Sequence, residues 1–194
     1  LLLGYSATAA VAKIVASTSF VFLAIRVGAT RAAYGRIILL GLVFSWFGDV
    51  FLIGGTQTAF LTGLVAFLFA HCAYIAAFGV RRINAQWAAV AAMPVATIGV
   101  LVSLWLTPHL PAELVVPVRV YTLVISLMVV AAFGTHGRAA STYIVAGAVL
   151  FFLSDLSVAA LRLVQTEFPT YVWGLPSYYA GQVCLALGSS NARS

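Results

Sequence analysis

Two aspartates lie in stretches of sequence that are otherwise almost wholly apolar. Asp49 is in residues 37–51 (IILLGLVFSWFGDVF) and Asp155 is in residues 143–160 (YIVAGAVLFFLSDLSVAA). A carboxylate inside a membrane-spanning helix is costly and usually marks a functional site. Such an acid can also serve helix packing, or relay an ion or a proton, but two of them together favour catalysis. We therefore expect Asp49 and Asp155 to be the catalytic residues.

A pair of carboxyl groups in a medium of low dielectric constant suits acid and base catalysis. The two groups do not both ionise readily, so one keeps its proton while the other acts as a base. This division of roles fits the hydrolysis of an acid-labile C–O bond, in which the acid protonates and the base activates water. Arg162 follows Asp155 by seven residues on roughly the same helix face. An ion pair with Arg162, or with Lys13, would keep Asp155 ionised and leave Asp49 as the proton donor.

Other polar residues are predicted at a similar depth. His71 lies in an apolar helix, where a histidine either hydrogen-bonds a neighbouring helix or lines a site. Tyr178 is placed as an interface anchor, and Gln182, one turn deeper, needs a partner inside the bundle. Lys13 is the only lysine. Its amine either extends to the membrane surface or meets a lipid phosphate or an aspartate.

Composition predicts the elements that carry these residues. Hydrophobic residues make up 63% of the chain and charged residues 7%, whereas soluble domains have about 25% charged residues. The apolar runs are too long and continuous for barrel strands. The sequence thus predicts an all-α, polytopic transmembrane helical bundle, with residues 1–194 as a single integral membrane domain. Breakers separate apolar runs at residues 1–12, 14–25, 37–53, 60–80, 87–106, 118–133, 143–161 and 172–187.

Two points in this division need comment. The first two runs form either one helix that contains Lys13, or a truncated helix, a turn and a second helix. The cluster of Pro108, Pro111 and Pro117 is taken as a break between two runs.

The basic residues predict the topology. The net charge is +6, but the arginines are scattered singly or in pairs, as topology-setting charges are, so we expect no nucleic-acid binding. Those in alternate loops fall on one side, which should be cytoplasmic together with the C-terminus. In a bacterium the protein would lie in the plasma or inner membrane. At about 1.5 Å per residue, both aspartates then lie roughly 18 Å or more from the cytoplasmic side.

Several kinds of site are missing from the sequence. There is no HExxH motif, and His109 and His136 are predicted near opposite membrane faces, so we expect no metal site. There is no P-loop and no GxSxG nucleophile motif. We therefore expect no metal or organic cofactor.

Several short motifs, taken in order, resemble the YhhN-like lysoplasmalogenase family of multi-pass membrane hydrolases. They are SWFGDVFL at residues 45–52, FLTGLVAF at 60–67 with His71 and Tyr74 following, FLSD at 152–155, and YYAGQ at 178–182. Lys13 matches the lysine at the start of the family's second helix, although Ile14 stands where proline is common. The family has eight helices, so the resemblance implies that the first is truncated here, with residues 1–12 as its tail.

The resemblance also implies a reaction and its site residues. The reaction is hydrolysis of the vinyl-ether bond of lysoplasmalogens to a fatty aldehyde and a glycerophospho-ethanolamine or glycerophospho-choline. The substrate would be a lysophospholipid drawn from the bilayer. Asp49 and Asp155 would be catalytic. The expected substrate-binding residues are Lys13, His71, Tyr74, Tyr178, Tyr179 and Gln182.

Three other functions are compatible with this sequence. A small proton-coupled transporter would carry its proton on the two aspartates. An intramembrane aspartyl protease would use them on a peptide, although FGD at residues 47–49 is only part of the GxGD pattern of such enzymes. A lipid-binding or scaffold protein without catalytic activity would tolerate replacement of both aspartates by asparagine.

Overall fold

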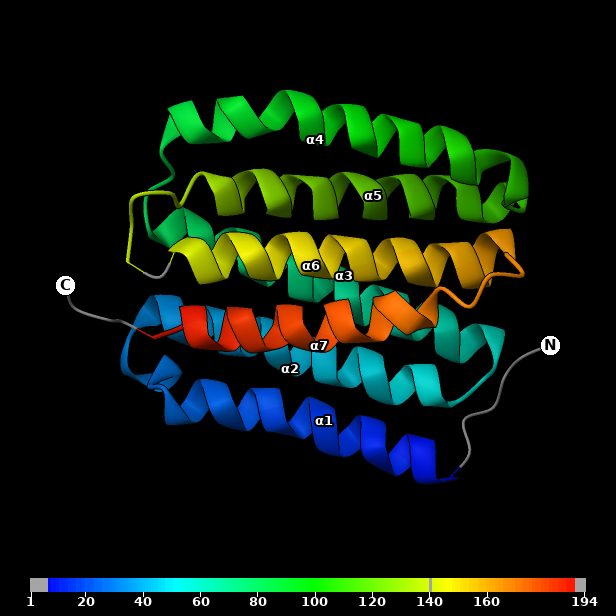
Figure 1. The fold of residues 1–194 in the computed structure, drawn as a ribbon, viewed down its shortest axis with the longest axis horizontal. Coiled ribbons are helices and arrows are strands. Elements are labelled where there is room, and N and C mark those ends of the chain that lie inside the picture. The colour runs from blue at the N-terminus through cyan, green and yellow to red at the C-terminus, as the bar shows by residue number, and fades with distance from the viewer. Residues whose placement is uncertain (1–6, 140, 191–194) are drawn as a thin grey trace.

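Long helices make up almost all of the structure, a computed structural model that describes residues 7–139 and 141–190. No strand occurs among those residues. Short 3₁₀ segments, η1 (Ala29–Arg31) and η2 (Thr107–His109), join two of the helix pairs, and a π-helical turn, η3 (Ala160–Val164), extends α6 (Figure 1). The helices are α1 (Ala7–Arg26), α2 (Ala33–Ile53), α3 (Gln57–Val80), α4 (Ala85–Leu106), α5 (Ala112–Phe133), α6 (Ser141–Ala159) and α7 (Tyr171–Gly188).

The predicted helical bundle is confirmed, with two corrections to the predicted runs. Residues 7–26 form one uninterrupted helix through Lys13, so the expectation that residues 1–12 are the tail of a separate helix is wrong for residues 7–12. Residues 1–6 lie outside the described part. Pro117 does not separate two runs but lies inside α5, which begins at Ala112. Proline is tolerated in membrane helices because neighbouring groups satisfy the backbone that it frees.

Six of the helices are long and apolar enough to cross a membrane. The sixth of these spans runs on from α6 through η3 to Val164. The helix outside this set is α7, which is 18 residues long. It is less apolar because it carries a cluster of polar residues that includes Tyr178, Tyr179 and Gln182. The chain is therefore an integral, multi-pass membrane protein.

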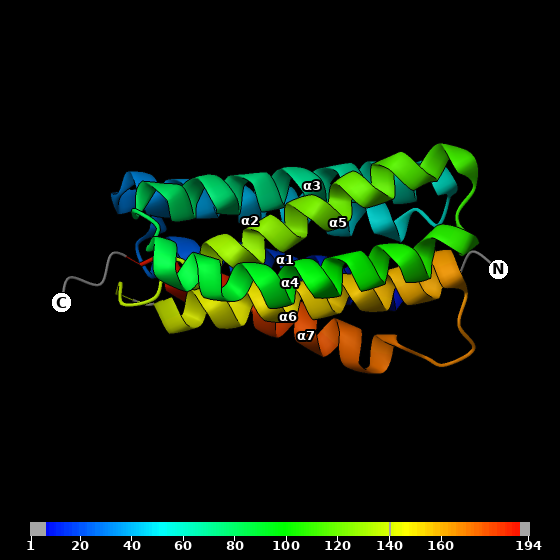
Figure 2. The ribbon, with the colours of Figure 1, turned by 90° about the horizontal axis from the view of Figure 1, so that it is seen from above.

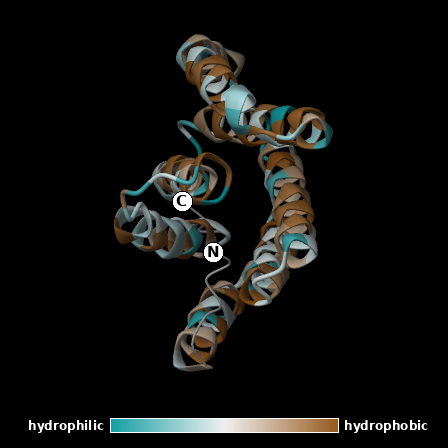
Figure 3. Ribbon diagram, turned by 90° about the vertical axis from the view of Figure 1, so that its right-hand side faces the viewer, coloured by the Kyte–Doolittle hydropathy of each residue, from teal (hydrophilic) through white to brown (hydrophobic). Residues whose placement is uncertain are grey.

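The helices form a curved row with a pair packed in its hollow. Contacts run from α1 to α2, to α3, to α5 and then to α4, while α6 touches α5 and α7 touches α1 and α2. The end-on view shows this arc, with α6 and α7 on its concave side (Figure 3). Viewed from above, α2 and α3 lie on one side of the molecule and α6 and α7 on the other (Figure 2). The last two helices are thus positioned to face residues on α1, α2, α3 and α5.

Glycines let α6 and α7 lie very close together. A Cβ atom on Gly147 would be 3.0 Å from the carbonyl oxygen of Gly181, and one on Gly181 would be 3.1 Å from that of Gly147. Small residues commonly allow such close approach between membrane helices. This contact fixes the position of Tyr178, which lies one turn before Gly181 on the same helix.

The loops divide the molecule into two different ends. At one end lie the loops that follow α1, α3 and α5, together with the end of α7 (Figure 1). The arginines of the described residues gather at this end, except Arg119 and Arg162. The prediction that these arginines share one side is confirmed for the described residues, and Arg193, which was predicted with them, lies outside the described part. We call this the arginine-rich end, and its members are Arg26, Arg31, Arg36, Arg81, Arg82 and Arg138.

Candidate active site

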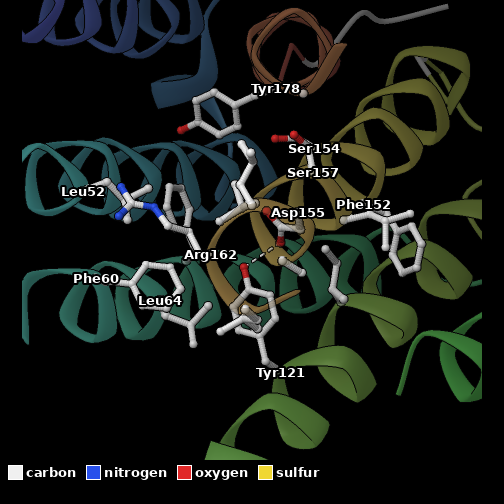
Figure 4. Close-up of a pocket in the computed structure, with 18 of the residues that line it drawn as sticks. Leu52, Phe60, Leu64, Tyr121, Phe152, Ser154, Asp155, Ser157, Arg162 and Tyr178 are labelled. Atoms are coloured by element: carbon white, nitrogen blue, oxygen red, sulfur yellow. Dashed lines mark hydrogen bonds between the residues drawn. The ribbon is translucent and has the colours of Figure 1, made fainter. Parts of the chain in front are cut away.

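A cavity of about 160 Å³ lies in the half of the bundle away from the arginine-rich end. All seven α-helices contribute to its lining, from Lys13 on α1 to Tyr178 on α7. Asp49 and Asp155 both line it, so two acids separated by more than 100 residues share one chamber. Figure 4 shows Asp155 pointing into this space between Tyr121 and Tyr178.

Asp49 is held by three donors from two other helices. Nζ of Lys13 is 2.7 Å from its Oδ1 atom. The hydroxyls of Ser17 and Tyr178 each donate to its Oδ2 atom at 2.6 Å. The residue is 1% exposed. An ammonium and two hydroxyl donors are the partners expected of a buried ionised carboxylate, which is stable only when paired and hydrogen-bonded.

Asp155 has a different set of partners and is less enclosed. The hydroxyl of Tyr121 donates to its Oδ2 atom at 2.6 Å, and Nε2 of His71 is 3.2 Å from the same oxygen. Nε2 of His71 also lies 3.0 Å from the Tyr121 hydroxyl. Among the described residues, no hydrogen bond reaches the Oδ1 atom of Asp155, whose side chain is 18% exposed. One carboxyl oxygen is therefore anchored and the other is open to the cavity.

The structure corrects the expected charge pairing. Within the described part of the chain, Arg162 makes no ion pair with Asp155, and its guanidinium instead lies 5.9 Å from the centre of the Phe60 ring. The cation beside an aspartate is Lys13, and the aspartate is Asp49. The sequence left open whether the Lys13 amine extends to the membrane surface, meets a lipid phosphate or meets an aspartate. In the structure it meets an aspartate. The basis for treating Asp155 as the ionised acid is removed, and the contacts favour Asp49 in that role.

The other predicted site residues fall into two groups. Lys13 and Tyr178 line the cavity. His71 lies behind the cavity wall, fully buried, with its imidazole on Tyr121 and Asp155. Tyr74 and Gln182 are also behind the wall and bond each other, with the Tyr74 hydroxyl donating to the amide oxygen at 3.1 Å.

The remaining residue of the predicted set, Tyr179, packs edge-on against the Tyr178 ring at 5.0 Å between centroids. It is not part of the cavity lining. The rings of Phe67 and Phe151 also meet Tyr178 edge-on, at 5.9 and 5.5 Å. Aromatic contacts of this kind fix the orientation of the Tyr178 ring, and so they hold its hydroxyl on Asp49.

Sequence reasoning missed Tyr121 and Ser17. Tyr121 is the closest partner of Asp155, and Ser17 is a partner of Asp49. Ser17 follows Lys13 by four residues, which places both on one face of α1. That spacing was a usable signal. Tyr121 lies in an apolar run, where a single tyrosine is common and gives no comparable signal.

Apolar side chains from α4, α5 and α6 form part of the cavity lining. We call it the apolar arm, and its residues are Val102, Leu106, Val118, Ile125, Phe152 and Leu156. α4 and α6 make few or no direct contacts, so α5 separates them over most of their length. A hydrocarbon chain fits such a lining because its burial needs no hydrogen bonds.

Comparisons with known proteins identify the family of the chain. The model of the YhhN family matches residues 8–189. The chain is 31% identical over 166 residues to the cattle protein lysoplasmalogenase TMEM86A, covering 80% of this chain and 66% of that protein. It is 33% identical over 162 residues to a lysoplasmalogenase of Mycobacterium tuberculosis, covering 79% and 60% of the two chains. It is 30% identical over 156 residues to human lysoplasmalogenase TMEM86B, covering 80% and 64%.

The chain spans somewhat less than two thirds of the length of these relatives. No solved structure matches it. The family match extends from α1 to the end of α7 and so includes every residue of the cavity. This chain belongs to the YhhN family.

Proposed function

We propose that this protein hydrolyses the vinyl-ether bond of lysoplasmalogens, releasing a fatty aldehyde and a glycerophospho-ethanolamine or glycerophospho-choline. The observation that carries the proposal is the single cavity lined by both Asp49 and Asp155, each with a different set of partners. The names of the relatives, which are lysoplasmalogenases, give the substrate class.

Asp155 is the proton donor in this proposal. Its Oδ2 atom accepts from Tyr121, so a proton on the carboxyl would sit on Oδ1, which is open to the cavity. The proton is transferred to the β-carbon of the vinyl ether, and the electrons of the double bond form the new C–H bond. An oxocarbenium cation remains on the carbon attached to oxygen.

Asp49 is the ionised partner. Its negative charge stabilises the oxocarbenium cation, and it orients the water that adds to the charged carbon. That water gives a proton to the Asp155 carboxylate as it adds, and a hemiacetal forms. The hemiacetal then breaks its C–O bond to the glycerol, whose oxygen takes the proton of the hemiacetal hydroxyl and leaves as an alcohol, while the other fragment becomes the aldehyde. Asp155 is protonated again, and the overall change consumes one water.

His71 and Tyr121 position the carboxyl group of Asp155. With the imidazole proton on Nε2, His71 donates to the Tyr121 hydroxyl and Tyr121 donates to Asp155. This chain of hydrogen bonds leads from a buried imidazole to the acid that faces the substrate. In this proposal the apolar arm receives the hydrocarbon chain, and the vinyl ether lies beside Asp155, which lines the same cavity.

The test is aldehyde release from purified protein given a lysoplasmalogen in detergent micelles. Asp49→Asn and Asp155→Asn should each lower kcat by at least about 100-fold, since a positioned acid or base contributes about 10²–10⁴ in rate. Glu113→Gln is the matched control, because Glu113 is an exposed acid outside the cavity. Its activity should stay within about 2-fold of the unaltered protein.

Two outcomes would overturn the proposal. One is the absence of aldehyde from the unaltered protein when its folding is verified by thermal unfolding. The other is full activity in both aspartate variants. An initial-rate measurement on a vinyl ether and on the corresponding saturated ether adds a chemical check, because only the vinyl ether is activated by protonation at carbon.

A further inference from the structure

We propose that Arg162 binds the phosphate of the substrate's head group and thereby selects a lysophospholipid over an uncharged vinyl ether. This inference rests on the proposed function and adds a residue for the part of the substrate that does not react. Arg162 lines the same cavity as the two aspartates. Figure 4 shows its guanidinium lying across the cavity near Leu52 and Phe60, away from Asp155.

The charge of Arg162 has no acidic partner in the described part of the chain. In that part of the chain, carboxylates contact basic side chains in two pairs, Lys13 with Asp49 and His71 with Asp155. Lys13 is the other cation in the cavity, and the carboxylate of Asp49 already matches its charge. The guanidinium of Arg162 faces the ring of Phe60 instead, at 5.9 Å. Of the two cationic side chains that line the cavity, Arg162 is thus the one whose charge is not matched by a carboxylate, and it is the better candidate to bind an anion.

The chemistry of arginine suits a phosphate. Its planar guanidinium presents two parallel N–H donors that match two phosphate oxygens, and it stays charged in surroundings of low polarity. The ring of Phe60 supports one face of the guanidinium, so less freedom is lost when the anion binds. A charged choline or ethanolamine group would extend beyond the phosphate toward the membrane surface.

The backbone of α6 brings Arg162 to this position. The helix ends in the π-helical turn η3, and Gln165 terminates it with a positive φ of 57°. The backbone N–H of Thr166 donates to the carbonyl of Ala160 at 3.1 Å and closes the turn. π-helical turns change the direction of side chains relative to a regular helix and are frequent at functional sites.

The spacing between Arg162 and Asp155 matches the substrate. They lie seven residues apart on one helix, or roughly 10 Å along its axis at about 1.5 Å per residue. In a lysoplasmalogen about seven bonds separate the reacting carbon from the phosphorus, which gives roughly 8–9 Å for an extended chain with bonds of about 1.5 Å. One molecule can therefore reach the proton donor and the guanidinium together.

The experiment compares binding of two lipids that differ only in the phosphate-containing head group. Lysophosphatidylethanolamine and the monoacylglycerol with the same acyl chain are titrated into the purified full chain in a non-ionic detergent, and native mass spectrometry gives their Kd values. The unaltered protein should bind the phospholipid at least about 10-fold more tightly than the monoacylglycerol. Arg162→Gln should remove most of this difference by weakening phospholipid binding alone, and Arg162→Lys should retain part of it.

Arg119→Gln is the matched control. Arg119 lies at the same end of the bundle but is exposed, donates to Thr107, and is not part of the cavity lining. This variant should keep the full difference between the two lipids. Thermal unfolding of each variant verifies its fold.

The proposal is overturned if Arg162→Gln keeps the preference for the phospholipid, if both lipids weaken equally, or if the unaltered protein has no such preference. Neither lipid contains a vinyl ether, so binding is measured without turnover. Failure of the proposed hydrolysis would leave the binding difference intact. Loss of the binding difference alone would leave aldehyde release from a vinyl-ether lipid intact.

Discussion

At the scale of single residues, the pairing of Lys13 with Asp49 is the contact most sensitive to change. Both side chains are buried, at 7% and 2% exposure. A buried charge is costly unless it is paired, and removal of one partner leaves the other uncompensated. The pair therefore contributes to the stability of the bundle.

Lys13→Met should lower the free energy of unfolding by about 3–5 kcal/mol, because it strands the carboxylate of Asp49 in the bundle. Thermal or denaturant unfolding in detergent measures this loss. The double variant Lys13→Met with Asp49→Asn should recover most of it, since no buried charge remains while the amide still accepts from Ser17 and Tyr178. A single variant as stable as the unaltered protein would contradict the pairing.

Tyr121→Phe should lower kcat by about 10–100-fold while KM changes little, because the hydroxyl that positions the Asp155 carboxyl is lost and packing is kept. Initial rates of aldehyde release over a range of lysoplasmalogen concentrations separate the two constants. Tyr171→Phe is the control, since Tyr171 lines the same cavity and no hydrogen bond from its hydroxyl is found in the described residues. A fall in activity of equal size in both variants would assign the effect to the cavity in general.

From the sequence, Asp49 and Asp155 are predicted to be functional residues, and the reason for this prediction is physical. An acid in a long apolar run stands out because the membrane excludes charge. The partners of each acid did not follow from the sequence, since helix periodicity gives height but not the rotation of one helix against another. The expected pair of Asp155 and Arg162 failed for this reason. Two residues on one helix face can still point into different parts of a cavity.

At the scale of elements, α1 shows how a buried pair overrides a local signal. A lysine in the middle of an apolar stretch favours a turn at the surface, which would split residues 1–25 into two helices. The chain instead continues as one helix from Ala7 to Arg26, because Asp49 on α2 receives the ammonium. In α5, similarly, Pro117 does not end the helix, and the cavity-lining residues of α5 all follow it.

The close contact between α6 and α7 beside the cavity gives a second prediction at this scale, which concerns stability. A Cβ atom on Gly174 would lie 2.1 Å from the Ser157 hydroxyl, so Gly174→Ala must push the two helices apart. We expect a loss of about 1–3 kcal/mol of stability, the usual cost of overpacking. Gly79→Ala is the control, because a Cβ there meets nothing within 4 Å. It should be neutral or slightly stabilising.

Thermal unfolding of both glycine variants in the same detergent decides between these expectations. Ser157 donates to the Thr170 hydroxyl at 3.1 Å, so its displacement would also disturb the start of α7. Equal stability of Gly174→Ala and Gly79→Ala would show that α6 and α7 adjust to the added methyl group.

At the scale of the whole molecule, the order of helices in space explains where the site lies. The arc from α1 to α4 leaves its concave side open, and α6 and α7 fill it. Each aspartate lies on a different part of this assembly, with Asp49 on the arc and Asp155 on the inserted pair. The site is completed only when α6 and α7 pack into the arc.

The same arrangement predicts from which side the substrate enters. The cavity lies in the half that contains Leu52, Phe60 and Tyr171, near the loops opposite the arginine-rich end. Arginine-rich loops stay cytoplasmic in multi-pass proteins because translocation of positive charge is disfavoured. We therefore expect the C-terminus in the cytoplasm and the cavity in the outer half of the membrane, so that the substrate comes from the outer leaflet.

Cysteine labelling tests this orientation. In a background with Cys72 and Cys184 replaced by alanine, Glu167→Cys places a thiol in the loop beside the cavity, and His136→Cys places one at the arginine-rich end. Both positions are exposed. A membrane-impermeant maleimide added to intact bacterial spheroplasts should label the first variant and label the second only after lysis. The reverse pattern would place Arg162 and the cavity on the cytoplasmic side, and the lipid would then have to come from the inner leaflet.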